Sequence, residues 1–198
     1  ELDERIPVDR NDFSVMIDGE KVRFDVVFNA IHGSPGENGL MQAYFELMGI
    51  PHTSCGHFES ALTFNKRECL AVARQYGIPT APSVFVTKGD DIDLDAVVEV
   101  TGLPCFVKPN RAGSSFGISK VYKKEDIPAA LNEAYREDNE VLIEGFLDGR
   151  EVTVGVMRIN GKVTVLPITE IVSMNDFFDY RAKYEGLSKE ITPAELPQ

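Results

Sequence analysis

The sequence predicts a mixed α/β protein, and three observations indicate this class. An apolar run over residues 22–31 precedes a glycine-rich loop and then a helical pattern, in the order strand, loop, helix. Short strands and helices alternate from about Ser83 to Glu144. Two strand-like runs then flank Asn160-Gly161, a dipeptide typical of a tight hairpin turn. We therefore expect part of an open parallel sheet, a compact α+β unit and a hairpin, in this order.

The first expected strand covers residues 22–31 (VRFDVVFNAI). Its residues alternate at first and then become almost wholly apolar, which is typical of a strand buried on both faces of a parallel sheet. The helix that follows covers residues 40–48, because its apolar side chains recur on one helical face. Gly49 and Pro51 are signals that end it.

A second helix is expected over residues 66–76, with Lys66 in its first turn and Gly77 and Pro79 after its end. His52 and His57 lie before it in a stretch rich in Pro, Gly and Ser, and we interpret both as loop histidines.

The compact unit and the hairpin come next. In the unit we expect strands over residues 83–87, 105–109, 118–122 and 140–144, and helices over residues 94–100 and 127–134. The hairpin strands cover residues 151–159 and 162–172. Residues 173–198 are polar, rich in Tyr and Phe, and show no period.

Composition excludes several classes of function. The chain has 32 Asp and Glu against 20 Lys and Arg, a net charge of −12, so it would repel a nucleic-acid backbone or an anionic membrane surface. No run approaches the roughly 18 apolar residues of a membrane span. Cys55, Cys69 and Cys105 are odd in number and widely spaced, so neither a disulfide framework nor a zinc site is indicated, and we expect a reducing cytoplasm. Because the chain has no initial Met and no obvious final element, we expect a piece of a longer protein.

Residues 106–118 (FVKPNRAGSSFGI) are the most informative segment. Lys108 ends an apolar strand, and a loop with two glycines and two serines follows, so one cation stands beside a row of N–H and O–H donors that suit phosphate oxygens. The Gly-Lys-Thr/Ser ending and the helix of a Walker loop are absent, so we interpret the segment as a strand-loop-strand lid over phosphates. A plain hairpin with a solvated lysine is the alternative.

Other segments each allow two interpretations. His32 follows the first strand, at the sheet edge where open α/β proteins bind ligands. Glu37 begins the next helix, where it favours either the helix dipole or a ligand. Glu144 ends a strand and Glu151 follows a short connector. This segment either contacts a base and its ribose or is a buried strand with a charged end in solvent. Residues 177–184 (FFDYRAKY) are either core-lining aromatics or a loop that covers a ligand.

Five motifs, in this order, resemble those of the D-alanine:D-alanine ligase family, which has the ATP-grasp fold. HGSPGENG is similar to its His-Gly-x-x-Gly-Glu-Asp-Gly loop, ALTFNK to its Ala-x-x-x-Asp-Lys, and FVKPNRAGSSFGISKV to its Val-Lys-Pro-x-x-x-Gly-Ser-Ser-x-Gly. EVLIEGFLDGREVTVGV resembles the strand and connector that hold adenine and ribose, and FFDYRAKY the loop over the active site. The resemblance implies the later part of an N-terminal open-sheet, Rossmann-like domain (1–63), the central ATP-grasp subdomain (64–143) and the start of the C-terminal subdomain (144–198).

The resemblance implies how the chain binds ATP. Lys66 and Lys108 contact the phosphates, and Lys183 reaches the γ-phosphate. Ser114 and Ser115 lie in the loop that closes over the phosphates. The residues that line adenine and ribose are Glu144, Phe146, Leu147 and Glu151.

The resemblance also implies the reaction. ATP phosphorylates the carboxylate of one D-alanine, and the amine of a second D-alanine attacks the acyl phosphate, giving the dipeptide for peptidoglycan precursors. The residues that line the D-alanine subsites are His32, Glu37, Ser114 and Tyr184, and the catalytic residues are Ser114, Tyr184, Glu37 and Lys183. A cytoplasmic homodimer is implied as well. A related ligase with D-lactate or D-serine as acceptor, or a non-catalytic nucleotide-binding module, stays an alternative.

The chain departs from the family pattern in a few places. Asn38 stands where the family usually has Asp, and Phe178 stands where it often has Tyr. Tyr184, by contrast, keeps the tyrosine that the family associates with D-alanine. The family's opening glycine-rich loop, with its glutamate, has no counterpart in this sequence. The sequence also lacks the family's C-terminal Asp, Glu and Asn that hold Mg²⁺, and the arginine that stabilises the tetrahedral intermediate. We therefore expect the chain by itself to be inactive, with the Mg²⁺ ligands outside it.

Overall fold

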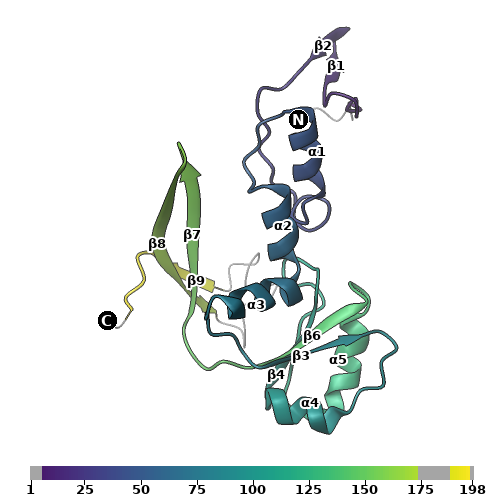
Figure 1. Ribbon diagram of the computed structural model, residues 1–198, viewed down its shortest axis with the longest axis vertical. Helices are drawn as coiled ribbons and strands as arrows, with labels where there is room; N and C mark the ends of the chain where they lie inside the picture. Colours follow the sequence, from purple (N-terminus) through teal and green to yellow (C-terminus); the bar gives the residue numbers. More distant parts are fainter. Residues whose placement is uncertain (1–5, 174–187, 197–198) are drawn as a thin grey trace. The chain divides into compact units, whose positions relative to one another are not determined.

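The computed structural model describes residues 6–173 and 188–196. The chain divides into two compact units, residues 1–80 with 110–113 and residues 81–109 with 114–198 (Figure 1). Among the described residues, no helix combines the length and the apolar character needed to cross a membrane.

The first unit holds three helices and a short hairpin. Its elements are β1 (Val15–Ile17), β2 (Glu20–Val22), α1 (Leu40–Met48), α2 (His57–Phe64) and α3 (Lys66–Gln75). Helices α1 and α3 confirm the sequence prediction, and α1 ends at Gly49 as expected. Helix α2 was not predicted, so the interpretation of His57 as a loop residue is wrong: it is the first residue of this helix, and its main-chain N–H donates to the Glu46 carboxylate at 2.9 Å.

The predicted strand over residues 22–31 is also wrong. Only Val22 belongs to a strand, and the rest of the run makes one parallel bridge, between Val27 and His52. Most of its apolar side chains are open to solvent, with Val26 60% and Phe28 80% exposed, although Val22 and Val27 are half-buried. A strand buried on both faces needs neighbours on both sides, and the described part of the chain supplies no more than this single bridge.

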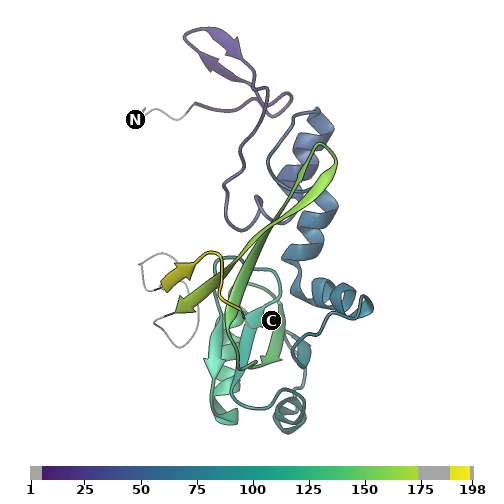
Figure 2. The same cartoon turned by 90° about the vertical axis from the view of Figure 1, so that its left-hand side faces the viewer.

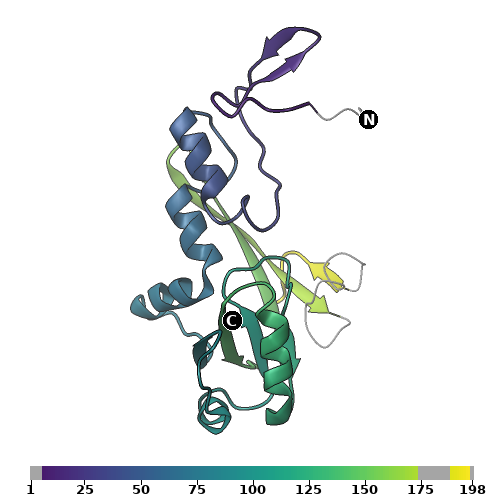
Figure 3. The same cartoon turned by 90° about the vertical axis from the view of Figure 1, so that its right-hand side faces the viewer.

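The second unit is built on a four-stranded antiparallel sheet. Its strands are β3 (Ser83–Thr87), β4 (Cys105–Pro109), β5 (Ser119–Val121) and β6 (Glu140–Gly145), in the order β3-β6-β4-β5. The helical elements are α4 (Leu94–Thr101), the 3₁₀ turn η1 (Lys124–Asp126) and α5 (Ile127–Ala134). All were predicted within a residue or two except η1. Figure 3 shows α5 lying across the sheet.

The core of this unit lies between one face of the sheet and the two helices. Val107, Val141 and Ile143 are fully buried there, packed with Ile127 and Ala134 of α5. Residues alternate in strand β4, so Phe106 and Lys108 are turned to the opposite face of the sheet. The alternation therefore leaves a second face on which polar side chains gather.

The predicted hairpin is present as β7 (Glu151–Ile159) and β8 (Lys162–Ser173), the long ribbon in Figure 2. Asn160 and Gly161 both have positive φ, 49° and 77°, as the type I′ turn of a two-residue hairpin requires. Strand β9 (Ser188–Ile191) pairs with β8. Residues 173–198 show no period in the sequence, yet Ser173 ends β8 and β9 is regular, because the partner strand stabilises a segment too short to show a period.

Candidate functional site

The face of the four-stranded sheet away from α4 and α5 carries an ion pair. Phe106 is paired in register with Glu144 of β6 and with Lys120 of β5, which places these three side chains on one face. Lys108, two residues along β4, places its Nζ 2.5 Å from Glu144 Oε2. Both side chains are mostly buried, 22% and 16% exposed. Partial burial weakens screening by water, so this pair is held more firmly than an ion pair on the surface.

Aromatic rings surround the ion pair. The Phe106 and Phe146 ring centroids lie 6.2 Å apart, and the Lys120 ammonium lies 4.3 Å from the centroid of Phe146. Lys108 lies 5.0 Å from the centroid of Phe106, and Lys120 also lies over Tyr122. Ring faces can stack on another flat ring, and ammonium groups can bind an anion attached to it. The face has the chemistry to bind a planar aromatic ligand that carries negative charge.

The connector after β6 begins at the edge of this face. The main-chain N–H groups of Gly145 and Phe146 donate to the carbonyls of Pro82 at 2.9 Å and Pro104 at 3.2 Å, which fixes the path of the chain. Leu147 is 65% exposed beyond them. The connector therefore leaves the sheet in a defined direction with an apolar side chain on display.

Strand β7 starts with Glu151, which is exposed. The preceding residue, Arg150, donates from Nε to Glu170 Oε1 at 2.6 Å and from Nη1 to the Glu195 carbonyl at 2.5 Å. Hydrogen bonds from Arg150 lower the pKa of Glu170 below its usual range. This clamp joins the start of β7 to β8 and so holds Glu151 at a constant place.

In the first unit, Lys66 and the loop after β4 lie together. Lys66 Nζ is 3.1 Å from the Ala112 carbonyl oxygen and 3.4 Å from that of Asn110. Further along the loop, beyond Gly113, Ser114 and Ser115 of the second unit have φ of 51° and 60°. Residues with side chains adopt this left-handed conformation at a cost of roughly 1–2 kcal/mol each. We call residues 110–118, which follow Lys108 and Pro109, the Lys-Pro loop: its backbone is strained at Ser114 and Ser115, and its carbonyls at Asn110 and Ala112 contact the Lys66 ammonium.

His32 and Glu37 line a pocket of about 500 Å³ in the first unit. Glu37 lies before α1 rather than in its first turn, so the helix-dipole interpretation is wrong. Its Oε2 instead accepts from the Gly33 N–H at 2.5 Å, and its own N–H donates to the Gly33 carbonyl at 2.8 Å. A Cβ built on Gly113 would lie 2.8 Å from Glu37 Oε2, so the Lys-Pro loop reaches this carboxylate.

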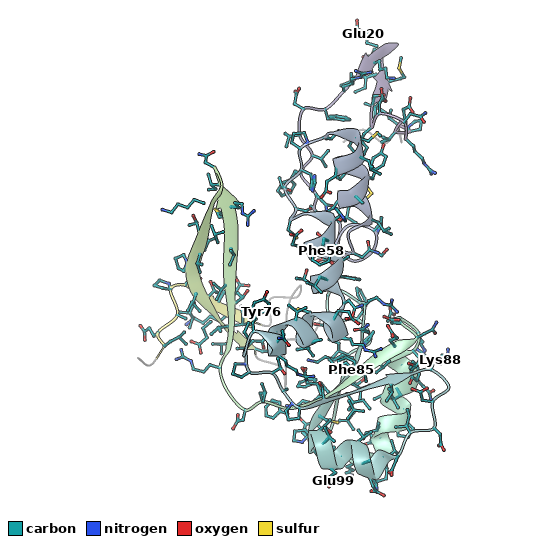
Figure 4. All side chains as sticks on the ribbon, viewed as in Figure 1. Glu20, Phe58, Tyr76, Phe85, Lys88 and Glu99 are labelled. Atoms are coloured by element: carbon teal, nitrogen blue, oxygen red, sulfur yellow. The ribbon has the colours of Figure 1, made fainter. Side chains whose placement is uncertain are left out.

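A second hollow, of about 550 Å³, lies beside β3 and α4 in the second unit. Asp90, Asp91 and Asp93 are among its lining, and Asp93 caps α4 by accepting from the N–H groups of Asp95 and Ala96. Figure 4 labels Phe85 and Glu99 on the two elements that form it. Three carboxylates would repel an anionic ligand, so this hollow is not a binding site for the negatively charged ligand that suits the cationic sheet face.

The remaining predictions concern the active-site loop over residues 177–184 and a metal site. Phe178, Lys183 and Tyr184 lie outside the described residues. Over residues 6–173 and 188–196, no three His, Cys, Asp or Glu side chains lie close enough to hold a metal ion. The residues described here therefore do not fit a Mg²⁺ site.

Sequence reasoning missed two groups of site residues. Phe106 and Lys120 become visible when the strands are read with period 2, because Phe106-x-Lys108 and Lys120-x-Tyr122 each place two side chains on one face. Asn110, whose side chain is fully buried, gave no signal, since its partners lie more than 40 residues earlier in the chain.

Comparison with known proteins identifies the family. Residues 72–198 match the family model described as D-ala D-ala ligase C-terminus, and residues 8–55 match D-ala D-ala ligase N-terminus. The chain belongs to the D-alanine:D-alanine ligase family. The resemblance of the five motifs is thereby confirmed, and with it the α/β, ATP-grasp fold.

Individual family members show how much of the length is present. The D-alanine–D-alanine ligases of Flavobacterium johnsoniae and Christiangramia forsetii are 63% and 54% identical over 98% and 97% of this chain. The chain spans about 60% of the length of these relatives. Among solved structures, D-alanyl-alanine synthetase A from Vibrio cholerae is 32% identical with a TM-score of 0.78, over 94% of this chain and 57% of that one. A D-Ala:D-Ser ligase from Enterococcus faecalis is 34% identical with a TM-score of 0.75, over 98% and 57%.

Proposed function

We propose that the protein is an ATP-dependent ligase that joins two D-alanine molecules. The observation that carries the proposal is the cationic, aromatic sheet face around Lys108 and Glu144, in a chain that belongs to this family. The names of the relatives that are 63% and 54% identical support the same activity.

The sheet face is the proposed site of the nucleotide. Its rings and the connector at Phe146 and Leu147 would hold adenine, with Glu144 at the edge of the base and Glu151 at the ribose. Lys108, which pairs with Glu144, would contact the phosphates in this arrangement. The Arg150 clamp supports the role of Glu151, because a ribose contact needs a carboxylate whose backbone is fixed.

The Lys-Pro loop is the proposed lid on the phosphates, with Lys66, Ser114 and Ser115. Strained backbone conformations cluster at ligand sites, and the two left-handed serines support this assignment. Lysine ammonium groups would stabilise the charge that spreads over the transferred phosphoryl group. Lys183 would meet the γ-phosphate from the active-site loop.

The proposed reaction has two balanced steps. A carboxylate oxygen of the first D-alanine forms a bond to the γ-phosphorus of ATP while the bond between that phosphorus and the β,γ-bridging oxygen breaks, and ADP leaves. The neutral amine of the second D-alanine then bonds to the acyl carbon, the carbon–oxygen bond to phosphate breaks, and phosphate and a proton leave. Binding of the amino acids would fall to His32, Glu37, Ser114 and Tyr184, and the pocket at His32 and Glu37 supports this for two of them.

Wider features of the protein are proposals too. Mg²⁺ would offset phosphate charge when bound, but the described residues do not form its site, so no step is assigned to it. We also propose the division at residues 63 and 143, a homodimer, and a place in the cytoplasm, where peptidoglycan precursors would be made from the dipeptide.

Calorimetric titration of the chain with ATP and Mg²⁺ tests the nucleotide site. Binding by the chain, its loss in Lys108→Ala, and its retention in Lys88→Ala are expected. Lys88 is an exposed lysine in the turn after β3 and serves as the matched control (Figure 4). Circular dichroism confirms that each variant is folded. If neither the folded chain nor the full-length protein binds ATP, the nucleotide site is wrong.

The second candidate is a ligase with a different acceptor. The D-Ala:D-Ser ligase from Enterococcus faecalis shows that this fold accommodates another acceptor, whereas the relatives that are 63% and 54% identical are named for D-alanine. Competition between D-alanine and D-lactate across pH separates amine from hydroxyl acceptors, since only the amine must lose a proton before it attacks. D-serine is distinguished by direct product analysis.

A further inference from the structure

Asn110 is a fully buried polar side chain in the Lys-Pro loop, two residues after Lys108. Its Oδ1 accepts from the main-chain N–H of Arg67 at 2.8 Å, and its Nδ2 donates to Asn65 Oδ1 at 3.0 Å. Its main-chain carbonyl accepts from the Lys66 N–H at 3.2 Å. These hydrogen bonds join one residue of the loop to the start of α3.

These bonds occupy the N-terminus of α3. The first-turn N–H groups of Lys66 and Arg67 donate to Asn110, and that of Glu68 donates to Asn65 Oδ1 at 3.2 Å. A helix N-terminus with free N–H groups would itself attract phosphate. Here those three donors bond within the chain, so an anion at this end of α3 would be bound by a charged side chain, such as that of Lys66, rather than by the helix terminus.

The Lys66 ammonium is aimed by the same contact. Lys66 is the first residue of α3, and its Nζ lies 3.1 Å from the Ala112 carbonyl oxygen in the loop. Both the helix that carries the lysine and the loop that receives its ammonium are attached to Asn110. The position of the charge relative to the loop thus depends on one buried side chain.

We propose that Asn110 is a positioning residue, which holds Lys66 and the Lys-Pro loop in the geometry that binds the ATP phosphates. The inference rests on the proposed nucleotide site and adds to it a residue that touches no ligand. Removing the amide leaves the Arg67 N–H and the Asn65 side chain with fewer partners, so the start of α3 is free to shift against the loop. Charged contacts to phosphate are sensitive to displacements of about 1 Å.

The test compares ATP with adenosine, which lacks the phosphates. In the full-length protein, dissociation constants for both are measured by calorimetry for the wild type, Asn110→Ala, Lys66→Ala and Ser14→Ala. Ser14 is a buried polar residue of the same unit, hydrogen-bonded to Asp12, and its variant controls for general loss of a buried hydrogen bond. Asn110→Ser replaces Asn110→Ala if the latter does not fold.

We expect Asn110→Ala and Lys66→Ala each to weaken ATP binding on the order of tenfold and adenosine binding by less than about twofold. Asn110→Ala should add little to Lys66→Ala in the double variant, because both act through one ammonium. Unchanged ATP binding in Asn110→Ala, an equal loss for ATP and adenosine, or additive effects would overturn the inference. If the wild type binds no ATP, the proposed function itself has failed, which is a separate result.

Discussion

Strand β6 and the run over residues 22–31 have similar apolar character and opposite environments. Val141, Leu142 and Ile143 of β6 are at most 1% exposed, whereas Phe28 is 80% exposed. Strand β6 pairs with β3 on one side and β4 on the other. The run makes one bridge, through Val27. Apolar sequence alone therefore does not make a buried strand; paired neighbours on both edges and a layer over its face do.

The sharpest test of this contrast replaces one residue in each region. Ile143→Ala should lower the free energy of unfolding by about 2–5 kcal/mol, because it opens a cavity in the centre of the sheet. Phe28→Ala should change it by less than about 0.5 kcal/mol, because that ring is already in water. Urea unfolding of this chain, followed by circular dichroism, measures both. A large loss in Phe28→Ala would mean that the run is covered in solution.

The two faces of β4 provide the next test. Lys108→Ala should cost about 2 kcal/mol or more in kcat/KM for ATP in the full-length protein, because a phosphate-directed cation is lost. Val107→Ala, on the buried face of the same strand, should instead act on stability, with a smaller effect on kcat/KM. Steady-state phosphate release and thermal unfolding separate the two effects. Equal kinetic losses in both variants would contradict the division of the strand into a core face and a ligand face.

Gly145 tests how tightly the sheet unit is packed at the connector. A Cβ at this position would lie 2.5 Å from the Thr101 carbonyl oxygen, so Gly145→Ala must displace backbone. We expect a loss of about 1–3 kcal/mol in the free energy of unfolding. Gly149→Ala is the control, because nothing lies within 4 Å of a Cβ there. Similar stability in the two variants would show that the end of β6 is looser than the structure indicates.

The smallest expected effect lies in the first unit, where α1 and α2 are joined by a polar contact. Hydrogen bonds from the His57 main chain and ring lower the pKa of Glu46 below its ordinary 4.5. The stabilising contribution of the ionised Glu46 carboxylate is therefore complete above pH 4.5 and disappears as the pH falls through the lowered pKa. The stability difference between wild type and Glu46→Gln, measured by urea unfolding from pH 7 to pH 3, should shrink over that range. A difference that stays constant would show that the charge plays no part.

The sequence predicted elements whose signals are local. Helix α1 ends at Gly49, the hairpin turns at Asn160 and Gly161, and β4 covers residues 105–109, all as expected. Lys66 and Lys108 could be singled out because each belongs to a motif with fixed spacing. Helix α2 was missed because Pro, Gly and Ser before His57 outweighed a short amphipathic pattern.

Features that depend on distant residues could not be predicted. Nothing near Asn110 in the chain indicates that its amide binds Asn65 and Arg67. Lys120 gathers with Phe106 and Phe146 because β4, β5 and the end of β6 meet in one sheet.

By itself, the sequence determined the family, the helices and strands with strong local signals, and the residue types available for phosphate and amino-acid binding, because motifs, caps and turns act over a few residues. Only the tertiary structure decided which apolar run is buried, which partner each lysine has and that Asn110 joins the Lys-Pro loop to α3. The physical reason is that burial and hydrogen-bond partners depend on what the folded chain brings alongside a residue. Strand β6 has two neighbours and residues 22–31 have a single bridge, although their side chains are alike.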